Sequence, residues 1–389
     1  MLRLHFLLVA LQHAVAAVKD IIFEDYLRQF DKVYHGAELN MRRVLFEQRK
    51  AQLLAAGSPR TWTAGFNHLT DATPDELQSS RGYRKELRNA AEAHPARASK
   101  SRTGTRKKTD IPDAIDWRQR SPAVCSPVKS QGGCGSCWAF AASTVIESHV
   151  AINSGVLLSL SPQEMTSCAP NPDGCGGDGG CSGATAQLAF AYAVEAGGVS
   201  DIWHNPYLSG MEFKSRQCEN NTQFWLPRKA SIEGFVTLPQ NDPQALMEAV
   251  AKVGPIAVSV DATDWWMYGG GIFDACNKTA PNINHAVVLD GYGVENGTKY
   301  WLIRNSWGDN FGEHGYIRLR RHDDEPCGED PDPLEGVGCK VGGPDKIWAC
   351  GECGVLSDSS YPLGANLGHK KSLAEAGPGD SRRLAMVHV

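Results

Sequence analysis

The sequence predicts an α+β protein in which a helical half precedes a sheet half, with the functional site in the cleft between them. Two alanine-rich helical patterns, at residues 138–152 and 184–196, alternate with glycine-rich loops. Runs of β-like composition then follow at residues 256–260, 286–292, 299–304 and 315–319. The chain has 389 residues, which is more than one hydrophobic core usually holds.

The first 17 residues predict a secretory signal peptide. Arg3 gives a positive start, residues 4–11 are mostly apolar, and Ala14-Val15-Ala16 offers the small side chains of a cleavage site. An anchoring helix is the alternative, but this apolar stretch is too short to span a bilayer. No later segment reaches about 18 uninterrupted apolar residues, so we expect no membrane span.

Twelve cysteines and three Asn-x-Ser/Thr sequons, at Asn220, Asn277 and Asn296, fit passage through the secretory pathway. We therefore expect a lysosomal, vacuolar or secreted glycoprotein with disulfide bonds.

Residues 18–110 predict a helical segment followed by a linker. The helical part repeats apolar residues at every fourth position, namely Ile22, Tyr26, Phe30 and Tyr34. Glu38, Arg42 and Phe46 continue this spacing and would share one helix face. Residues from about 85 to 110 are polar and basic, which is typical of an exposed linker open to proteolysis, so we place maturation near Asp110.

The charge of the chain is unevenly divided. Residues 18–110 carry 18 Lys and Arg against 12 Asp and Glu, whereas residues 111–363 carry 16 against 30. The two parts attract each other at neutral pH, and protonation of carboxylates would weaken that attraction in acid. Uneven charge is also common in soluble proteins, so this pattern alone leaves both interpretations open.

Three separated motifs carry the residue types of a thiol-protease site. Gln131 and Cys137 lie in the run Gln131-Gly-Gly-Cys-Gly-Ser-Cys-Trp138, His285 follows Cys137 by 148 residues, and Asn305 lies 20 residues further on. A cysteine nucleophile, a distant histidine base and an asparagine that orients the imidazole form a recurring catalytic set. The run Cys-Gly-Ser-Cys-Trp matches the signature of papain and cathepsin proteases at every position. The chain therefore resembles the papain family from about residue 20 to about residue 363.

Two other interpretations of the cysteines are open. Cys134 and Cys137 could form a thioredoxin-like redox pair, but this explains neither Gln131 nor Asn305. A zinc site is the second, with ligands Cys327, Cys339, Cys350 and Cys353. These cysteines lack two paired Cys-x-x-Cys units, which disfavours zinc. A catalytically silent homologue with a binding or inhibitory role, and an amide-transfer enzyme with the same residues, are the remaining functional alternatives.

The resemblance implies a papain-like two-domain fold over residues 111–363, with a helical left half and a β-barrel-like right half. It implies a monomeric cysteine endopeptidase that acts on protein and peptide substrates, without a cofactor, a metal or nucleic acid. Cys137 would be the nucleophile, as a thiolate paired with the His285 imidazolium. Asn305 would orient the imidazole, and Gln131 would complete the oxyanion hole. The resemblance also implies that Trp307 and Trp138 support the site.

The resemblance also implies that residues 18–110 are an inhibitory propeptide. The spacing of Glu38, Arg42 and Phe46 is similar to a helical motif of cathepsin L-type propeptides, and residues 65–71 are similar to a second one. Arg49 departs from the first motif and Leu69 from the second.

In the family, a pocket accepts the side chain two residues before the scissile bond. Its matching positions here are Thr185, Ala186, Ser259, Ile283 and Asp358. Four of these are small or apolar, which favours a hydrophobic substrate side chain. An ionised Asp358 would also admit Lys or Arg.

By the same resemblance, three disulfides are expected: Cys134–Cys181, Cys168–Cys218 and Cys276–Cys353. The resemblance leaves five cysteines without an assignment, namely Cys125, Cys175, Cys327, Cys339 and Cys350. The last three lie in an insertion from about residue 322 to 352, for which we expect a stapled surface loop. Residues 364–389 are expected to form a disordered tail.

Overall fold

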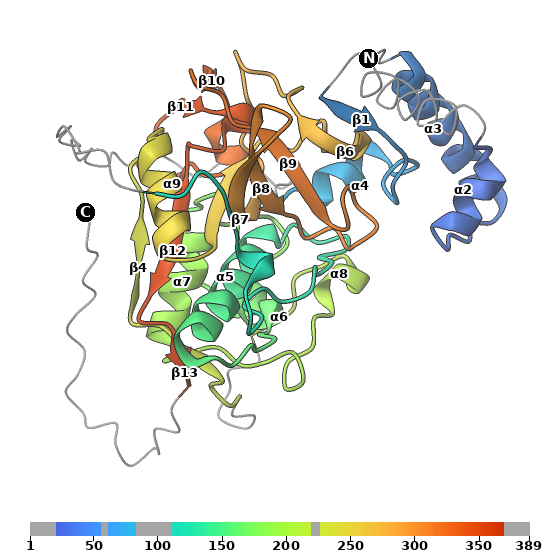
Figure 1. Ribbon diagram of the computed structural model, residues 1–389. Helices are drawn as coiled ribbons and strands as arrows, with labels where there is room; N and C mark the ends of the chain where they lie inside the picture. Colours follow the sequence, from blue (N-terminus) through green and yellow to red (C-terminus); the bar gives the residue numbers. More distant parts are fainter. Residues whose placement is uncertain (1–20, 56–60, 83–110, 219–225, 369–389) are drawn as a thin grey trace.

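The computed structural model describes residues 21–55, 61–82, 111–218 and 226–368. The predicted signal peptide and basic linker lie outside these ranges. Figure 1 shows helices α5 to α8 on one side of the molecule, the main sheet on the other, and helices α2 and α3 beyond one edge of that sheet. Within the described ranges, no helix is long and apolar enough to cross a membrane.

The helical half is built around one buried helix. Its members are α5 (Cys137–Ser154), α6 (Pro162–Cys168), α7 (Ala186–Glu195) and α8 (Ser209–Glu212). Every residue of α5 from Cys137 to Ala151 is buried, because small side chains let α7 and the sheet pack closely on it. The helix ends at Gly155, which adopts the left-handed conformation that favours glycine.

The sheet half contains nine strands. Along the sheet the order is β1 (Trp62–Ala64), β6 (Tyr268–Phe273), β9 (Tyr316–Arg320), β8 (Thr298–Arg304), β7 (His285–Glu295), β5 (Ile256–Val260), β12 (Ser359–Leu363) and β4 (Gly234–Thr237), and β2 (Ile115–Asp116) pairs with β7. The described strands follow an open path, so the barrel-like half expected from the sequence is not a closed barrel. Strand β5 is buried along its whole length, which explains its unbroken apolar composition.

Shorter elements complete the two halves. They are η2 (Trp117–Gln119), β3 (Ala230–Ser231), α9 (Pro243–Lys252), η3 (Trp265–Met267) and η5 (Glu352–Gly354). The insertion forms a separate hairpin of β10 (Cys327–Asp330) and β11 (Ile347–Cys350), with η4 (Pro333–Glu335) in the loop between them.

Five disulfides staple the described chain. Three are the pairs expected from the resemblance, Cys134–Cys181, Cys168–Cys218 and Cys276–Cys353. Two involve cysteines that the sequence left open, Cys175–Cys339 and Cys327–Cys350. Cys134 therefore bonds Cys181 and not Cys137, which excludes the redox pair. All four cysteines considered as zinc ligands are used in disulfides.

The first residues of the expected disordered tail are part of the fold. Residues 364–368 are ordered, because β13 (Asn366–Leu367) pairs with β3 and Ala365 is buried. The rest of that tail lies outside the described ranges.

The N-terminal part forms a small unit of its own. Helices α2 (Phe23–Gln29) and α3 (Gly36–Ala55) pack through Phe23, Tyr26 and Phe46, all nearly inaccessible to solvent. Strand β1 then joins the main sheet as its edge, antiparallel to β6. Helix α4 (Pro74–Ser79) begins with a capping box between Thr73 and Glu76. This unit is therefore attached to the sheet half by backbone hydrogen bonds.

Candidate active site

Cys137 is the first residue of α5 and lies at the junction of the two halves. Its side chain is 3% exposed. The thiol donates a hydrogen bond to the backbone carbonyl of Arg81 at 3.1 Å, and the sulfur accepts one from the Ala286 N–H at 3.4 Å. Arg81 belongs to the N-terminal part, so this segment contacts the candidate nucleophile directly.

His285 opens strand β7 and faces Asn305 at the end of β8. The distance from His285 Nε2 to Asn305 Oδ1 is 2.8 Å, and the same oxygen accepts from the Ser306 N–H. The Trp307 ring stacks on the imidazole with 4.9 Å between centroids, and Trp265 contacts it edge-on at 6.1 Å. The histidine ring is thus fixed by one hydrogen bond and two indoles, and Trp307 covers it as the sequence predicts.

Gln131 is fully buried, and its side chain is held at both ends. Its amide nitrogen donates to the Cys134 carbonyl at 3.0 Å, and its amide oxygen accepts from Ser306 Oγ at 2.6 Å. A primary amide has two N–H donors. One donor therefore remains beside the cysteine loop, in a side chain that cannot rotate freely.

Trp138 supports the glycine-rich loop that faces the cysteine. Its ring is fully buried, and Nε1 donates to the Gly180 carbonyl at 3.2 Å. The disulfide Cys134–Cys181 joins the same two loops. The nucleophile loop and the glycine-rich loop are therefore held together at two points.

Burial by the N-terminal segment keeps the pair of candidate catalytic groups neutral. Burial raises the pKa of the Cys137 thiol to about 11, although backbone N–H groups oppose this shift. Burial lowers the pKa of His285 to about 4, and the hydrogen bond that its ring donates to the Asn305 amide oxygen opposes this shift. The thiol is therefore protonated and the imidazole uncharged near neutral pH. The thiolate–imidazolium pair expected from the sequence stays a prediction for the mature chain, and α5 directs its N-terminus at the thiol.

The five expected pocket residues lie close together, but they do not all line one surface. Ser259 lines a cavity that also touches Cys137. Asp358 lies next to Ser259, and its two carboxyl oxygens accept from Ser259 Oγ at 2.7 Å and from Gln187 Nε2 at 2.6 Å. Burial raises the pKa of Asp358. Its carboxyl group is therefore turned into the protein and satisfied by neutral donors.

Of the other three, Ala186 is buried in α7 and Thr185 caps that helix without a side-chain hydrogen bond. Ile283 is fully buried, and its side chain lies against Gly354. The admission of basic residues by Asp358 stays a prediction.

Residues 80–82 of the expected inhibitory propeptide run through the cleft. Trp307 Nε1 donates to the Ser80 carbonyl at 2.8 Å. Gly82 has a φ of +123°, and a Cβ added there would lie 2.9 Å from the Cys137 sulfur. A glycine is required because backbone, and no side chain, fits between the sulfur and the opposite loop. The site is therefore blocked by the chain's own segment.

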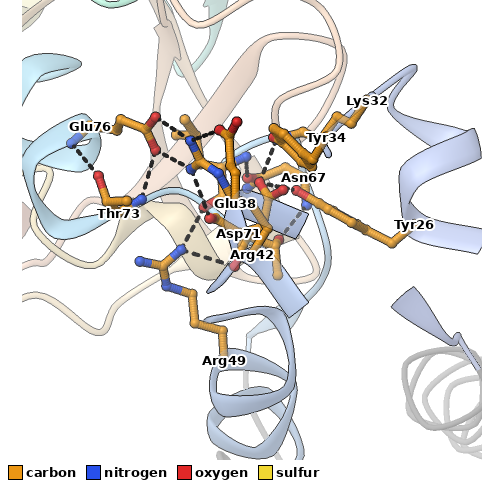
Figure 2. Close-up of polar contacts among 12 residues, drawn as sticks. Tyr26, Lys32, Tyr34, Glu38, Arg42, Arg49, Asn67, Asp71, Thr73 and Glu76 are labelled. Atoms are coloured by element: carbon orange, nitrogen blue, oxygen red, sulfur yellow. Dashed lines mark hydrogen bonds and ion pairs between the residues drawn. The ribbon is translucent and has the colours of Figure 1, made fainter. Parts of the chain in front are cut away.

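An ionic network holds this segment in place (Figure 2). Arg42 on α3 pairs with Glu76 on α4 and with Glu38 one turn away, and it donates to the Asp71 carbonyl at 3.1 Å. The Asp71 carboxylate accepts from Tyr26 at 2.9 Å and pairs with Lys32. The face formed by Glu38, Arg42 and Phe46 in the sequence is thus the face that carries the network.

Arg49 departs from the helical motif of the family's propeptides, yet the structure gives it a function in this segment. Its guanidinium donates to the Leu69 and Thr70 carbonyls, each at 2.9 Å, and lies 5.4 Å from the ring centre of Trp266 in the sheet half. Asn67 Nδ2 donates to the Trp266 carbonyl at 2.8 Å. Helix α3 is therefore linked through this arginine to Trp266 of the sheet half.

Comparison with known proteins identifies the family. The model of the papain family cysteine proteases matches residues 111–337. The chain is 33% identical over 311 residues to Pro-cathepsin H of Mus musculus, covering 79% of this chain and 87% of the relative. It is 35% identical over 270 residues to Cathepsin S of Mus musculus, covering 69% and 74%.

Solved structures of precursors match over both parts of the chain. A recombinant stem bromelain precursor has a TM-score of 0.66 at 30% identity, covering 88% of this chain and 97% of that one. Digestive procathepsin L 3 of Tenebrio molitor larval midgut has a TM-score of 0.64 at 26% identity, covering 87% and 97%. These matches extend the likeness to the N-terminal segment that fills the cleft. The chain therefore belongs to the papain family of cysteine proteases, hydrolases with relatives that are made as zymogens.

Proposed function

We propose that the mature protein hydrolyses peptide bonds through Cys137, with His285 as the acid and base and Asn305 as the residue that orients it. The observation that carries this proposal is the contact between His285 Nε2 and Asn305 Oδ1, beside a cysteine that opens a helix. An asparagine acceptor fixes the tautomer of a histidine at such a site.

Each of these residues has its own role in the reaction. The Cys137 sulfur attacks the peptide carbonyl and forms a thioester, while His285 protonates the leaving amine. Water then attacks the thioester, with His285 as the base, and regenerates the thiol. The second amide N–H of Gln131 and the backbone N–H of Cys137 would stabilise the oxyanion, where loss of one donor costs about 100- to 1000-fold in rate.

The N-terminal residues 18–110 act as the inhibitory prosegment in this proposal. Residues 80–82 occupy the place of a substrate next to Cys137, and they raise the thiol pKa by burying it. Removal of the prosegment would expose both groups to water and restore the thiolate–imidazolium pair. We infer that maturation takes place in an acidic compartment of the secretory pathway.

A pocket beside Ser259 would receive the substrate side chain two residues before the scissile bond. Small or apolar residues around it favour a hydrophobic side chain. Admission of Lys or Arg would require Asp358 to exchange its contacts with Gln187 and Ser259 for a charged partner.

The test is hydrolysis of fluorogenic Phe-Arg and Arg-Arg peptides after acid maturation, with wild type and Cys137→Ser. A thiol-directed epoxide should label Cys137 and abolish activity, and the serine variant should be inactive and unlabelled. Hydrolysis that survives the substitution would refute the assignment of the nucleophile. The ratio of the two peptides, compared between wild type and Asp358→Ala, tests the pocket.

A further inference from the structure

The insertion, expected as a stapled surface loop, reaches the candidate active site. Its residues 333–340, here called the strap, leave the hairpin β10–β11 on the sheet half and reach the glycine-rich loop of the helical half. The disulfide Cys175–Cys339 fixes that end. The disulfide Cys327–Cys350 closes the hairpin at the other end. The strap is thus tied by a disulfide to the helical side of the cleft, and it continues into the closed hairpin on the sheet side.

The strap touches both walls of the cleft through backbone atoms. A Cβ added to Gly336 would lie 1.7 Å from the Ile283 carbonyl oxygen and 3.2 Å from the Asn284 nitrogen, so the strap contacts the sheet-side wall without a gap. On the helical side, the Gly338 carbonyl accepts from the Gly176 N–H at 2.8 Å. No substrate chain could pass between the strap and either wall at these points.

The strap stands close to the candidate nucleophile. A cavity beside the site is bounded by Cys137, His285, Ala184, Ser259, Glu335 and Gly336. The first two belong to the candidate catalytic set and the last two to the strap. Ser259 belongs to the pocket assigned to the residue two before the scissile bond. The strap therefore closes the end of the cleft that would hold the N-terminal part of a substrate.

The closed end is also acidic. Glu335 in the strap accepts a hydrogen bond from Asn282 Nδ2 at 2.7 Å. In the zymogen Arg81 lines the same cavity as Glu335. Burial lowers the pKa of Arg81, and the negative charges of Asp261, Glu335 and Asp264 oppose that shift. A basic residue of the chain itself is thus found beside the strap.

We propose that the strap makes the mature enzyme an N-terminal exopeptidase, which releases one or two residues from a free N-terminus. Glu335, which lines the cavity beside Cys137, receives the α-ammonium group of the substrate. This activity replaces the endopeptidase activity expected from the sequence, and it rests on the proposed function of Cys137. The chemistry is the same hydrolysis: water adds across one peptide bond through the thioester, and no other reactant is required.

Two properties of the substrate explain this activity: the number of residues before the scissile bond and the charge of the α-amino group. A substrate with more than two residues before the scissile bond has to pass through the position of Gly336. An α-amino group has a pKa of about 7.7 to 8.0, so it is charged at neutral and acidic pH. A hydrogen bond between charged groups contributes a factor of roughly 10 to 100 in binding.

The experiment compares three reporter peptides with acid-matured protein: Phe-Arg with a free amine, N-acetyl-Phe-Arg, and Gly-Gly-Phe-Arg. Wild type should show a kcat/KM at least about 10-fold higher for the free dipeptide than for the other two. In Cys175→Ser/Cys339→Ser, which frees the strap, the extended peptide should gain about 10-fold or more. The control Cys168→Ser/Cys218→Ser removes a disulfide that does not involve the strap, between residues 50 positions apart in the helical half, and should keep the wild-type ratio.

Two further measurements use protein whose folding is not in question. Mass spectrometry of an unmodified 15-residue peptide with wild type should show successive losses from the N-terminus. In Glu335→Gln, the ratio of free to acetylated dipeptide should fall towards one.

Internal cleavage of the long peptide, or equal rates on free, acetylated and extended peptides with an epoxide-labelled Cys137, would overturn the strap proposal alone. Absence of both hydrolysis and labelling would overturn the proposed function and this inference with it.

Discussion

The prosegment and the strap both lie across the cleft beside Cys137, but they are held there in different ways. The prosegment is attached by the β1–β6 pairing and by single hydrogen bonds, and the network around Arg42 and Asp71 holds its own elements together. The strap is attached to the helical half by the disulfide Cys175–Cys339, and the disulfide Cys327–Cys350 closes the hairpin from which it extends. One segment can leave when noncovalent contacts weaken, whereas the other stays for the life of the folded protein.

One buried titratable group in each region responds to acid with opposite sign. Burial lowers the pKa of His68 in the prosegment to about 4. The folded prosegment then binds fewer protons than the unfolded one, so its stability falls as the pH drops from about 6.5 towards 4. In the insertion, burial raises the pKa of Asp330 to about 6. Here the folded state binds more protons, so stability rises as the pH falls through 6.

The difference shows how one chain can carry a removable and a permanent element at the same site. Through His68, acid destabilises the prosegment, which must leave. Through Asp330, acid stabilises the insertion, which stays. Four measurements would break or sharpen this comparison.

Thiol reactivity should show the largest effect. With a pKa of about 11, the Cys137 thiolate fraction in the zymogen at pH 7 is about 300-fold below that of an ordinary thiol with a pKa near 8.5. Iodoacetamide should therefore modify the zymogen on the order of 100-fold more slowly than the mature enzyme. Peptide mapping by mass spectrometry measures both rates. Similar rates would mean that residues 80–82 do not bury the sulfur in solution.

Acid release of the prosegment should depend on His68. Its lowered pKa predicts that attachment weakens roughly 40-fold between pH 6.5 and 4.5. His68→Gln removes the titrating group and should move the onset of activation to lower pH. The measurement is the pH profile of activation in trans by a trace of mature enzyme, with the exposed His35→Gln as control. An unchanged profile would assign acid release to carboxylates such as Glu76.

Substitution in the Arg42 network should give the next largest effect, a loss of inhibition by the prosegment. Arg42→Met keeps the apolar stem and leaves Glu76 and Glu38 unpaired, which should weaken inhibition by about 2 kcal/mol, or roughly 30-fold. Arg43→Met is the matched control, because Arg43 forms an exposed pair with Glu24 and such pairs contribute little. Inhibition constants of the separate prosegments against mature enzyme would compare them. Equal losses in both variants would contradict the role of the buried face.

The pH dependence that Asp330 gives to opening of the insertion should be the smallest effect. The raised pKa predicts that opening of the insertion is about 10-fold more frequent at pH 7 than at pH 5. Hydrogen exchange of residues 326–350, corrected for intrinsic rates, should show this dependence in wild type and lose it in Asp330→Asn. A dependence of the reverse sign would remove the contrast with the prosegment.

Much of the fold followed from periodicity. The helices at 137–154 and 186–195 and the strands at 256–260, 285–295, 298–304 and 316–320 lie where the patterns predict them. These elements have one dominant environment, buried helix or buried strand, so local composition reflects it. The open path of the sheet and the ordering of β13 depend on pairings between distant segments, for which a single sequence carries no signal.

The sequence by itself determined the residues of the candidate chemistry. Cys137, His285, Asn305 and Gln131 are recognisable because each requires a particular residue type within a particular motif. Only the tertiary structure decided the state of these groups and the access to them. Their pKa values depend on burial by residues 80–82, and access depends on a disulfide between residues 164 positions apart. Desolvation and closure act through space, so they are set by which segments meet and not by the motifs themselves.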